Sequence, residues 1–301
     1  MAADAIAASA PRSLGAHAAG TSIWRRVTRR IWRDKVGLAG MLLVFAIVLI
    51  ALLAPLIAPY DPVDTHLDQA FLPAGTPGHL FGTDLYGRDI LSRVVWGARP
   101  SLAVGFVATC FALAIGATLG IVIGFYGGWF DTVAMRVIDV MLAFPYLLLA
   151  IVIVGALGPG LFNAVLAVAI TAIPFWVRLI RGMVISFANE QFVEAGRATG
   201  ATNAHLMRSA ILPNVAPYII VAFSINIGYL ILEAASLSFL GLGAQPPSPE
   251  WGAMLAENRN YLTLAPNTVV APGAAIFLIV LGLSLFGDAL RDAFDVRLRD
   301  E

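Results

Sequence analysis

Residues 100–130 read PSLAVGFVATCFALAIGATLGIVIGFYGGWF, and no charged side chain interrupts them. A helix needs roughly 20 apolar residues to cross about 30 Å of hydrocarbon, so this run is long enough to span a membrane. Similar uncharged runs recur along the chain, and most of the charged residues lie between them. The sequence therefore predicts an all-α polytopic membrane protein.

The composition supports the same fold class. The 301 residues are 59% hydrophobic and 13% charged, whereas ordinary soluble domains carry roughly 25% charged residues. This deficit of charge excludes a soluble globular protein. The formal net charge is zero, which gives no global attraction to nucleic acid, and no nucleic-acid partner is expected.

Six membrane-spanning helices are predicted from the positions of the apolar runs. The clearest four are expected at 36–58, 100–130, about 217–240 and about 269–290. The apolar stretch 140–177 is too long for one helix and contains GALGPG at 155–160, so it is expected to form two helices joined by a tight turn. The third helix then begins near Asp131, and the spacing of Arg136 and Asp139 within it favours an ion pair between them.

Basic residues predict the orientation in the membrane. With the N-terminus in the cytoplasm, only four of the 19 lysines and arginines fall outside, namely Arg88, Arg93, Arg99 and Arg259. Cytoplasmic segments carry the excess of such residues in membrane proteins. We therefore expect a multi-pass protein of the cytoplasmic (inner) membrane with both termini in the cytoplasm.

The two ends of the chain are expected to lie outside the helical bundle. Residues 1–21 are rich in alanine and predict a disordered tail, and residues 292–301 predict a short cytoplasmic tail. Residues 22–35 place apolar side chains at helical spacing opposite five arginines, which is typical of an amphipathic helix lying on anionic lipid. The alternative is a plain cluster of topogenic charge, which gives the same orientation.

The outer segment 59–99 contains FGTDLYGRDILSR at residues 81–93. Thr83 or Asp84 could cap a helix there, with Asp89 and Arg93 paired at i and i+4. We expect an amphipathic helix at the outer membrane interface, separate from the span that begins at residue 100.

The inner segment 181–213 predicts a helical elbow that projects into the cytoplasm. Charged and apolar residues alternate from Glu190 to Ala198, Gly200 interrupts the helix, and Thr202 could cap a second short helix over 203–209. Such a charged, rigid projection is typical of a docking surface for a soluble partner.

The fifth span ends in EAASLSFLGLG at residues 233–243. A carboxylate inside an apolar span is costly, so Glu233 should face a polar pathway or a partner. The alternative is a structural hydrogen-bond anchor near the outer end of the helix, where water reaches it.

These three segments resemble the inner-membrane permeases of ATP-binding cassette importers, most closely the C-type permease of dipeptide, oligopeptide and nickel systems. The resemblance runs from Trp24 to the C-terminus. In that family the inner loop reads E-A-A, three residues, G, nine residues, I-x-L-P. The matching positions are Glu194, Ala195, Gly200, Leu212 and Pro213. Gly196 replaces the third residue of the motif, an alanine, and Ala210 replaces the isoleucine.

The resemblance implies a type I (MetI-like) permease fold, with a five-helix core over 100–291, and one half of a two-permease channel. The implied partners are a second homologous permease in a heterodimer, two cytoplasmic ATP-binding subunits and an extracytoplasmic solute-binding protein. The residues implied to couple to the ATPases are Glu190, Glu194, Ala195, Gly196, Arg197, Gly200, Ala201, His205, Leu212 and Pro213. The implied pathway residues are Glu233, Ser236 and Asn226. The implied contacts of the binding protein are Asp84, Arg88, Asp89 and Arg93.

The resemblance also implies ATP-driven uptake of di- or oligopeptides, with nickel or a glutathione-like compound as alternative cargo. No catalysis, cofactor or metal is expected in this chain, because Lys35 is its only lysine and no P-loop is possible. ATP and Mg would be bound by the partner ATPases. A secondary transporter would need intramembrane ionisable pairs or broken helices. Apart from Glu233, the sequence shows no such feature. A membrane hydrolase is disfavoured because none of the four histidines lies in a span.

Overall fold

The computed structural model describes residue 30 and residues 32–295. The predicted tail 1–21, most of the predicted interfacial helix 22–35 and residues 296–301 lie outside the described part. The first described long helix, α2 (Lys35–Leu52), begins at Asp34, whose carboxylate accepts a hydrogen bond from the Val36 N–H at 3.0 Å.

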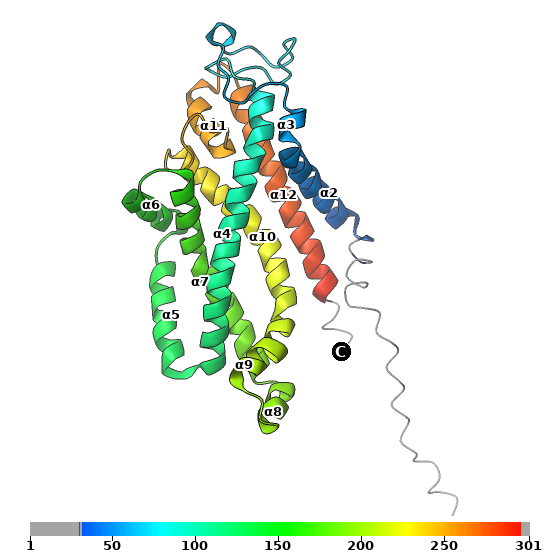
Figure 1. The fold of residues 1–301 in the computed structure, drawn as a ribbon, viewed down its shortest axis with the longest axis vertical. Coiled ribbons are helices and arrows are strands. Elements are labelled where there is room, and N and C mark those ends of the chain that lie inside the picture. Colours follow the sequence, from blue (N-terminus) through cyan, green and yellow to red (C-terminus); the bar gives the residue numbers. More distant parts are fainter. Residues whose placement is uncertain (1–29, 31, 296–301) are drawn as a thin grey trace, which may run out of the picture.

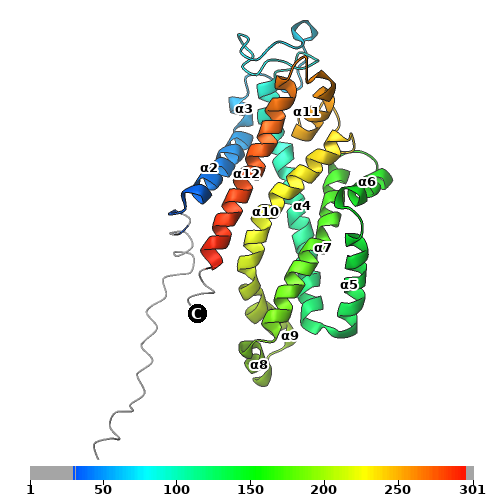
Figure 2. The ribbon, with the colours of Figure 1, turned by 180° about the vertical axis from the view of Figure 1, so that it is seen from behind.

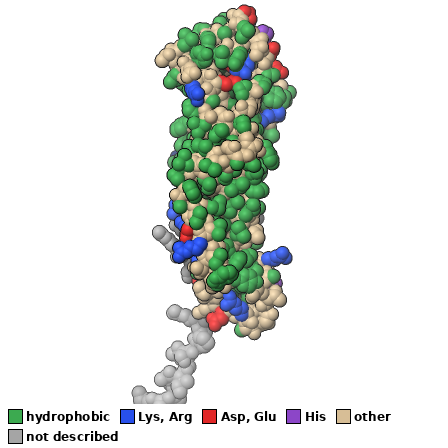
Figure 3. Space-filling view, turned by 90° about the vertical axis from the view of Figure 1, so that its left-hand side faces the viewer, with side chains coloured by type: hydrophobic (Ala, Val, Ile, Leu, Met, Phe, Trp, Pro, Cys, Tyr) green, Lys and Arg blue, Asp and Glu red, His purple; other side chains and the backbone are tan. Residues whose placement is uncertain are grey.

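The described chain forms one elongated helical bundle (Figure 1). Five of its helices are long and apolar enough to cross a membrane. They are α2, α4 (Ile90–Tyr126), α7 (Leu161–Ala188), α10 (Leu212–Phe239) and α12 (Asn267–Asp295). On the face shown in Figure 3, apolar side chains cover most of the middle of the bundle, and charged side chains gather towards its two ends. This distribution fits a protein that crosses a bilayer lengthwise.

A bent pair of helices gives a sixth span if the two helices together count as one crossing. Helices α5 (Gly128–Leu142) and α6 (Tyr146–Leu157) meet at 89° across three residues that end in Pro145. Proline disfavours a helical conformation of the residue before it, which accounts for the break. The predicted turn between the third and fourth spans is confirmed, at residues 158–160.

Two ion pairs fasten α5 to α7. Arg178 donates to Asp139 at 2.7 Å, and Arg181 makes a bidentate contact with Asp131. The predicted pairing of Asp139 with Arg136 is therefore wrong. The neighbouring helix offers Asp139 an arginine across the α5–α7 contact, which local spacing on α5 could not reveal.

The core lies where α4 and α7 pack together. Gly116, Gly120 and Gly124 repeat along α4, and a Cβ atom on any of them would approach the side chains or backbone of α7 at about 3 Å or less. Small residues at this spacing allow two helix backbones to approach closely. This four-residue repeat of glycines on α4 ends at Gly124, because the next glycine at that spacing, Gly128, belongs to α5 and adopts φ +64°.

The two ends of the bundle differ in construction (Figure 2). At the end we call outer, following the orientation predicted from the sequence, α3 (Ala54–Ile57) leads into an irregular segment that holds the short helix η1 (Leu67–Gln69). The outer end is completed by α11 (Trp251–Asn258) and η3 (Arg259–Tyr261). The inner end consists of α8 (Gln191–Ala198), α9 (Asn203–His205) and a π-helical turn (Leu206–Ile211).

Candidate coupling and translocation sites

The inner elbow, residues 189–211, turns at Gly200. This residue has φ +83°. Its N–H donates to the Arg197 carbonyl, and the Ala201 N–H donates to the Gly196 carbonyl, each at 3.0 Å. These two bonds form the Schellman motif that ends many helices with a left-handed residue. The left-handed conformation costs a residue with a side chain about 1–2 kcal/mol, which explains the glycine.

The return of the elbow begins at Thr202, whose hydroxyl accepts the His205 N–H at 3.3 Å. The predicted break at Gly200 and the predicted cap at Thr202 are both confirmed. The chain then runs through the π-helical turn directly into α10. Leu212 and Pro213 therefore open α10.

Three buried side chains anchor the elbow to the main core, namely Val193, Leu206 and Ile211. A Cβ atom on Gly196 would lie 2.6 Å from Cδ2 of Leu206. The glycine at the position of the family's alanine therefore lets α8 pack closely on the return segment. The elbow is thus a projection fastened to the core.

The outward side of the elbow presents free charge. Glu190 and Glu194 are exposed one turn apart, and neither forms an ion pair within the described part of the chain. His205 is exposed as well. Arg197 lies over the Phe125 ring at 5.4 Å and thereby ties α8 to the inner end of α4. This surface forms the extreme inner end of the bundle (Figure 1).

The outer end contains a buried cluster of four charged side chains, which we call the outer cluster: Asp84, Arg88, Arg93 and Glu257. Arg88 contacts Asp84 at 2.7 Å and Glu257 at 2.8 Å. Arg93 contacts Glu257 at 3.0 Å and Asp84 at 3.6 Å. None of the four side chains is more than 10% exposed. Two arginines and two carboxylates thus neutralise each other and hold α11 against the start of α4.

The structure corrects the local prediction for the outer segment. Asp89, and not Thr83 or Asp84, caps the helix, because its carboxylate accepts the Ser92 N–H at 2.7 Å. Asp89 contacts His79 at 2.9 Å and does not pair with Arg93. The helix that follows is the first part of α4, which continues unbroken for 37 residues. A separate amphipathic helix was therefore a wrong prediction.

Contact of these outer residues with a binding protein stays a prediction. Asp84, Arg88, Asp89 and Arg93 are all buried within this chain. Each of the four pairs with a neighbour inside this chain, and these contacts hold the outer segment in place.

The three predicted pathway residues all lie on α10. Asn226 is 8% exposed, and its side-chain oxygen has no hydrogen-bond partner among the described residues. Glu233 stands two turns further out and likewise has one buried carboxylate oxygen without such a partner. The Ser236 hydroxyl donates to the Leu232 carbonyl at 2.8 Å, so its donor is satisfied within the helix. Asn226 and Glu233 therefore retain unused hydrogen-bonding capacity, and Ser236 retains less.

The comparison with protein families decides the identity of the fold. Residues 116–300 match the family described as the inner membrane component of binding-protein-dependent transport systems. The chain belongs to this family. Residues 22–74 of the permease also match the N-terminal TM domain of oligopeptide transport permease C, which makes it a C-type permease of an ABC importer.

Similar proteins cover nearly the whole permease. A dipeptide transport system permease protein, DppC, of Alkalihalophilus pseudofirmus is 45% identical over 92% of this chain and 91% of that protein. A glutathione transport system permease protein, GsiD, of Pectobacterium atrosepticum is also 45% identical, over 92% of each chain.

A solved structure shows the same fold. The permease is similar to a chain of the inward-facing MetNI methionine ABC transporter, with a TM-score of 0.56 and 20% identity over 68% of this chain and 97% of that one. The predicted all-α, MetI-like fold is therefore confirmed. The family also agrees with a transport role without catalysis in this chain.

Proposed function

We propose that this permease forms half of the channel of an ATP-driven importer that carries small peptides across the cytoplasmic membrane. The observation that carries the proposal is the 45% identity, over 92% of the chain, to a dipeptide permease. The equally similar glutathione permease transports a compound that is itself a small peptide derivative, so both relatives favour the same cargo class. Neither nickel complexes nor ATP-independent transport is favoured by these likenesses.

The proposed assembly contains a second homologous permease, two ATP-binding subunits that hydrolyse ATP, and an extracytoplasmic binding protein. The chain's lack of a P-loop lysine supports this division of labour. The inner elbow supports it too, because its anchored core and unpaired carboxylates suit a lever seated in a groove of one ATPase.

Loss of uptake tests the proposed function directly. Deleting the permease from its host should abolish ATP-dependent uptake of a labelled dipeptide, and restoring the gene should recover it. Normal dipeptide uptake in the deletion strain would contradict the proposal.

The coupling role of the elbow is tested by charge reversal. Glu194→Lys should lower both uptake and substrate-stimulated ATPase activity by at least about tenfold. The lysine would face the ATPase group that binds the Glu194 carboxylate, and like charges placed at an interface cost several kcal/mol. The matched control is Asp68→Lys, the same reversal at an exposed residue of η1, at the other end of the bundle. Equal losses in both variants, or normal coupling in Glu194→Lys, would show that the elbow is not the lever.

The proposed orientation places the elbow and both termini in the cytoplasm. In a background without Cys110, cysteines introduced at Thr76 and Pro247 should react with an impermeant thiol reagent added from outside. A cysteine at Asn203 should react only after the membrane is opened. Labelling of position 203 from outside would overturn the orientation.

A further inference from the structure

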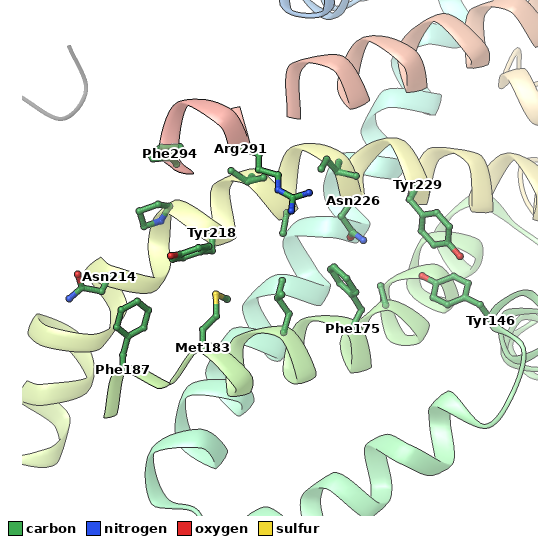
Figure 4. A pocket seen from close by; sticks show the side chains of 16 residues that line it. Tyr146, Phe175, Met183, Phe187, Asn214, Tyr218, Asn226, Tyr229, Arg291 and Phe294 are labelled. Atoms are coloured by element: carbon green, nitrogen blue, oxygen red, sulfur yellow. The ribbon is translucent and has the colours of Figure 1, made fainter. Parts of the chain in front are cut away.

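A cavity of about 880 Å³ opens between α7 and α10, below the level of Glu233. Its size lies within the range of roughly 300–1,000 Å³ typical of small-molecule sites. The rings of Phe175, Phe187, Tyr218 and Tyr229 form much of its wall (Figure 4). The mainly apolar wall is interrupted by few polar groups, which is the usual composition of a ligand pocket.

One polar group in the wall is unsatisfied. Asn226 lines the cavity, and its side-chain oxygen is buried without a hydrogen-bond partner among the described residues. An unpaired buried amide costs free energy, so a ligand that reaches the Asn226 side chain and supplies a hydrogen-bond partner is favoured. A side-chain amide carries one acceptor and two donors, and can therefore pair with the C=O and N–H of a peptide bond.

One charged group reaches the same cavity. Arg291, on α12, is the only charged residue in the described lining. Its side chain projects towards the space between α10 and α7 (Figure 4). It forms no ion pair within the described residues. Guanidinium groups bind carboxylates in a bidentate manner.

We propose that this cavity binds the transported peptide, with Asn226 pairing with its backbone amide, Arg291 binding its terminal carboxylate and the aromatic wall accepting its side chains. The inference rests on the proposed function and adds where and by which groups the cargo is held. Recognition through backbone and terminus, with a broad apolar wall, favours peptides of varied sequence. A lipid tail would leave both polar groups unpaired, and occupation by a helix of the second permease is an outcome that the experiment below distinguishes.

The site is tested by photo-cross-linking in vesicles that contain the complete transporter. The probe is a labelled dipeptide whose second residue is a photoactivatable phenylalanine with a free carboxylate. We expect the label on the α7 and α10 segments that line the cavity, between residues 172–183 and 217–229. The C-terminal amide of the same dipeptide should compete at least about tenfold less well, because it lacks the charge that Arg291 binds.

Four variants separate binding from structure. Asn226→Leu should reduce labelling about tenfold and Arg291→Gln about 10- to 100-fold, as expected for one neutral and one charge-assisted hydrogen bond. Asn226→Gln and Arg291→Lys should recover part of the loss. Arg291→Gln should also make the acid and the amide compete equally. The matched control, Arg136→Gln, removes an exposed arginine of α5 that lies outside the cavity and should not change labelling.

Uptake of the same dipeptide is measured in parallel. Uptake without labelling of the two segments overturns the cavity site and leaves the proposed function standing. Absence of uptake contradicts the proposed function. Absence of both uptake and labelling contradicts the proposed function and the cavity site. Labelling that is unchanged in Arg291→Gln and Asn226→Leu also overturns the site. Cross-linking of a photoactivatable residue at Phe175 to the second permease, with or without peptide present, would assign the cavity to the subunit interface.

Discussion

At the outer end of the permease, two arginines and two carboxylates are buried against one another, whereas at the inner end Glu190 and Glu194 face solvent without an ion pair in the described chain. The outer cluster joins α11 to the start of α4, and the elbow joins α7 to α10. Charges that are paired inside the chain stabilise the fold. Charges that are left free are available to another protein, so the two ends should respond in opposite ways to the same substitution.

The largest effect is expected from breaking the outer cluster. Glu257→Ala leaves Arg88 and Arg93 buried with only one carboxylate, and such a loss typically costs about 3–5 kcal/mol. Thermal unfolding of the purified complex should shift strongly downward. Glu194→Ala removes the same group at an exposed site and should change stability by no more than about 0.5 kcal/mol. Similar shifts of the unfolding temperature in Glu257→Ala and Glu194→Ala would contradict the proposed difference between the two ends.

A smaller effect is expected from the turn of the elbow. Gly200→Val forces a β-branched residue into a left-handed conformation, at a cost of about 1–2 kcal/mol. No atom crowds the position of the added Cβ, so the cost is conformational. Uptake and substrate-stimulated ATPase activity should fall together, while the binding protein keeps its affinity for ligand. Gly200→Asn is the control, because asparagine tolerates this conformation better and should recover coupling.

Glu233 tests the region between the two ends. Glu233→Gln keeps the shape of the side chain and removes its charge, so a carboxylate that meets the amino group of a passing peptide should lose most of that interaction. We expect uptake to fall severalfold while the transporter still assembles, as measured by co-purification of its subunits. Poor assembly with normal transport per assembled complex would identify Glu233 as a structural anchor.

The smallest effect is expected from Gly196→Ala. Alanine gains about 1 kcal/mol of helix propensity over glycine. The added Cβ also displaces the end of the Leu206 side chain, which offsets part of that gain. The net change in thermal stability should therefore lie within about 1 kcal/mol, and coupling should persist. A severe loss of coupling would mean that the Gly196–Leu206 contact sets the position of the lever.

The features of the molecule that depend on local sequence signals could be predicted from the sequence. The Gly200 turn and the Thr202 cap follow from residue types that only those backbone positions favour, and both were predicted correctly. The tight turn after the third span was found for the same reason. The sharp bend before Pro145, between α5 and α6, was not predicted, because the residues around it form an uninterrupted apolar run.

Contacts between distant segments could not be predicted from the spacing of residues within one segment. Arg93 was expected to pair with Asp89 four residues away, but its carboxylate partner on α11 is Glu257, 164 residues later in the chain. Asp139 likewise pairs across helices, with Arg178. The Arg291 side chain reaches the cavity only because α12 packs against α10, so closely that a Cβ atom on Gly287 would lie 2.5 Å from Cγ1 of Ile225. The sequence identified the charge of each residue, but which residue it pairs with depends on the packing of the helices.

The outer cluster also has a consequence for the order in which the permease is made. Arg88 and Arg93 enter the growing chain well before Glu257, which follows Arg88 by 169 residues. Until the last helical hairpin has been synthesised and inserted, the arginines have only one of their two carboxylates and the outer end stays open. A chain released early would thus display unmatched positive charge at the membrane surface. The outer end therefore reaches its final arrangement of charges only near the close of translation.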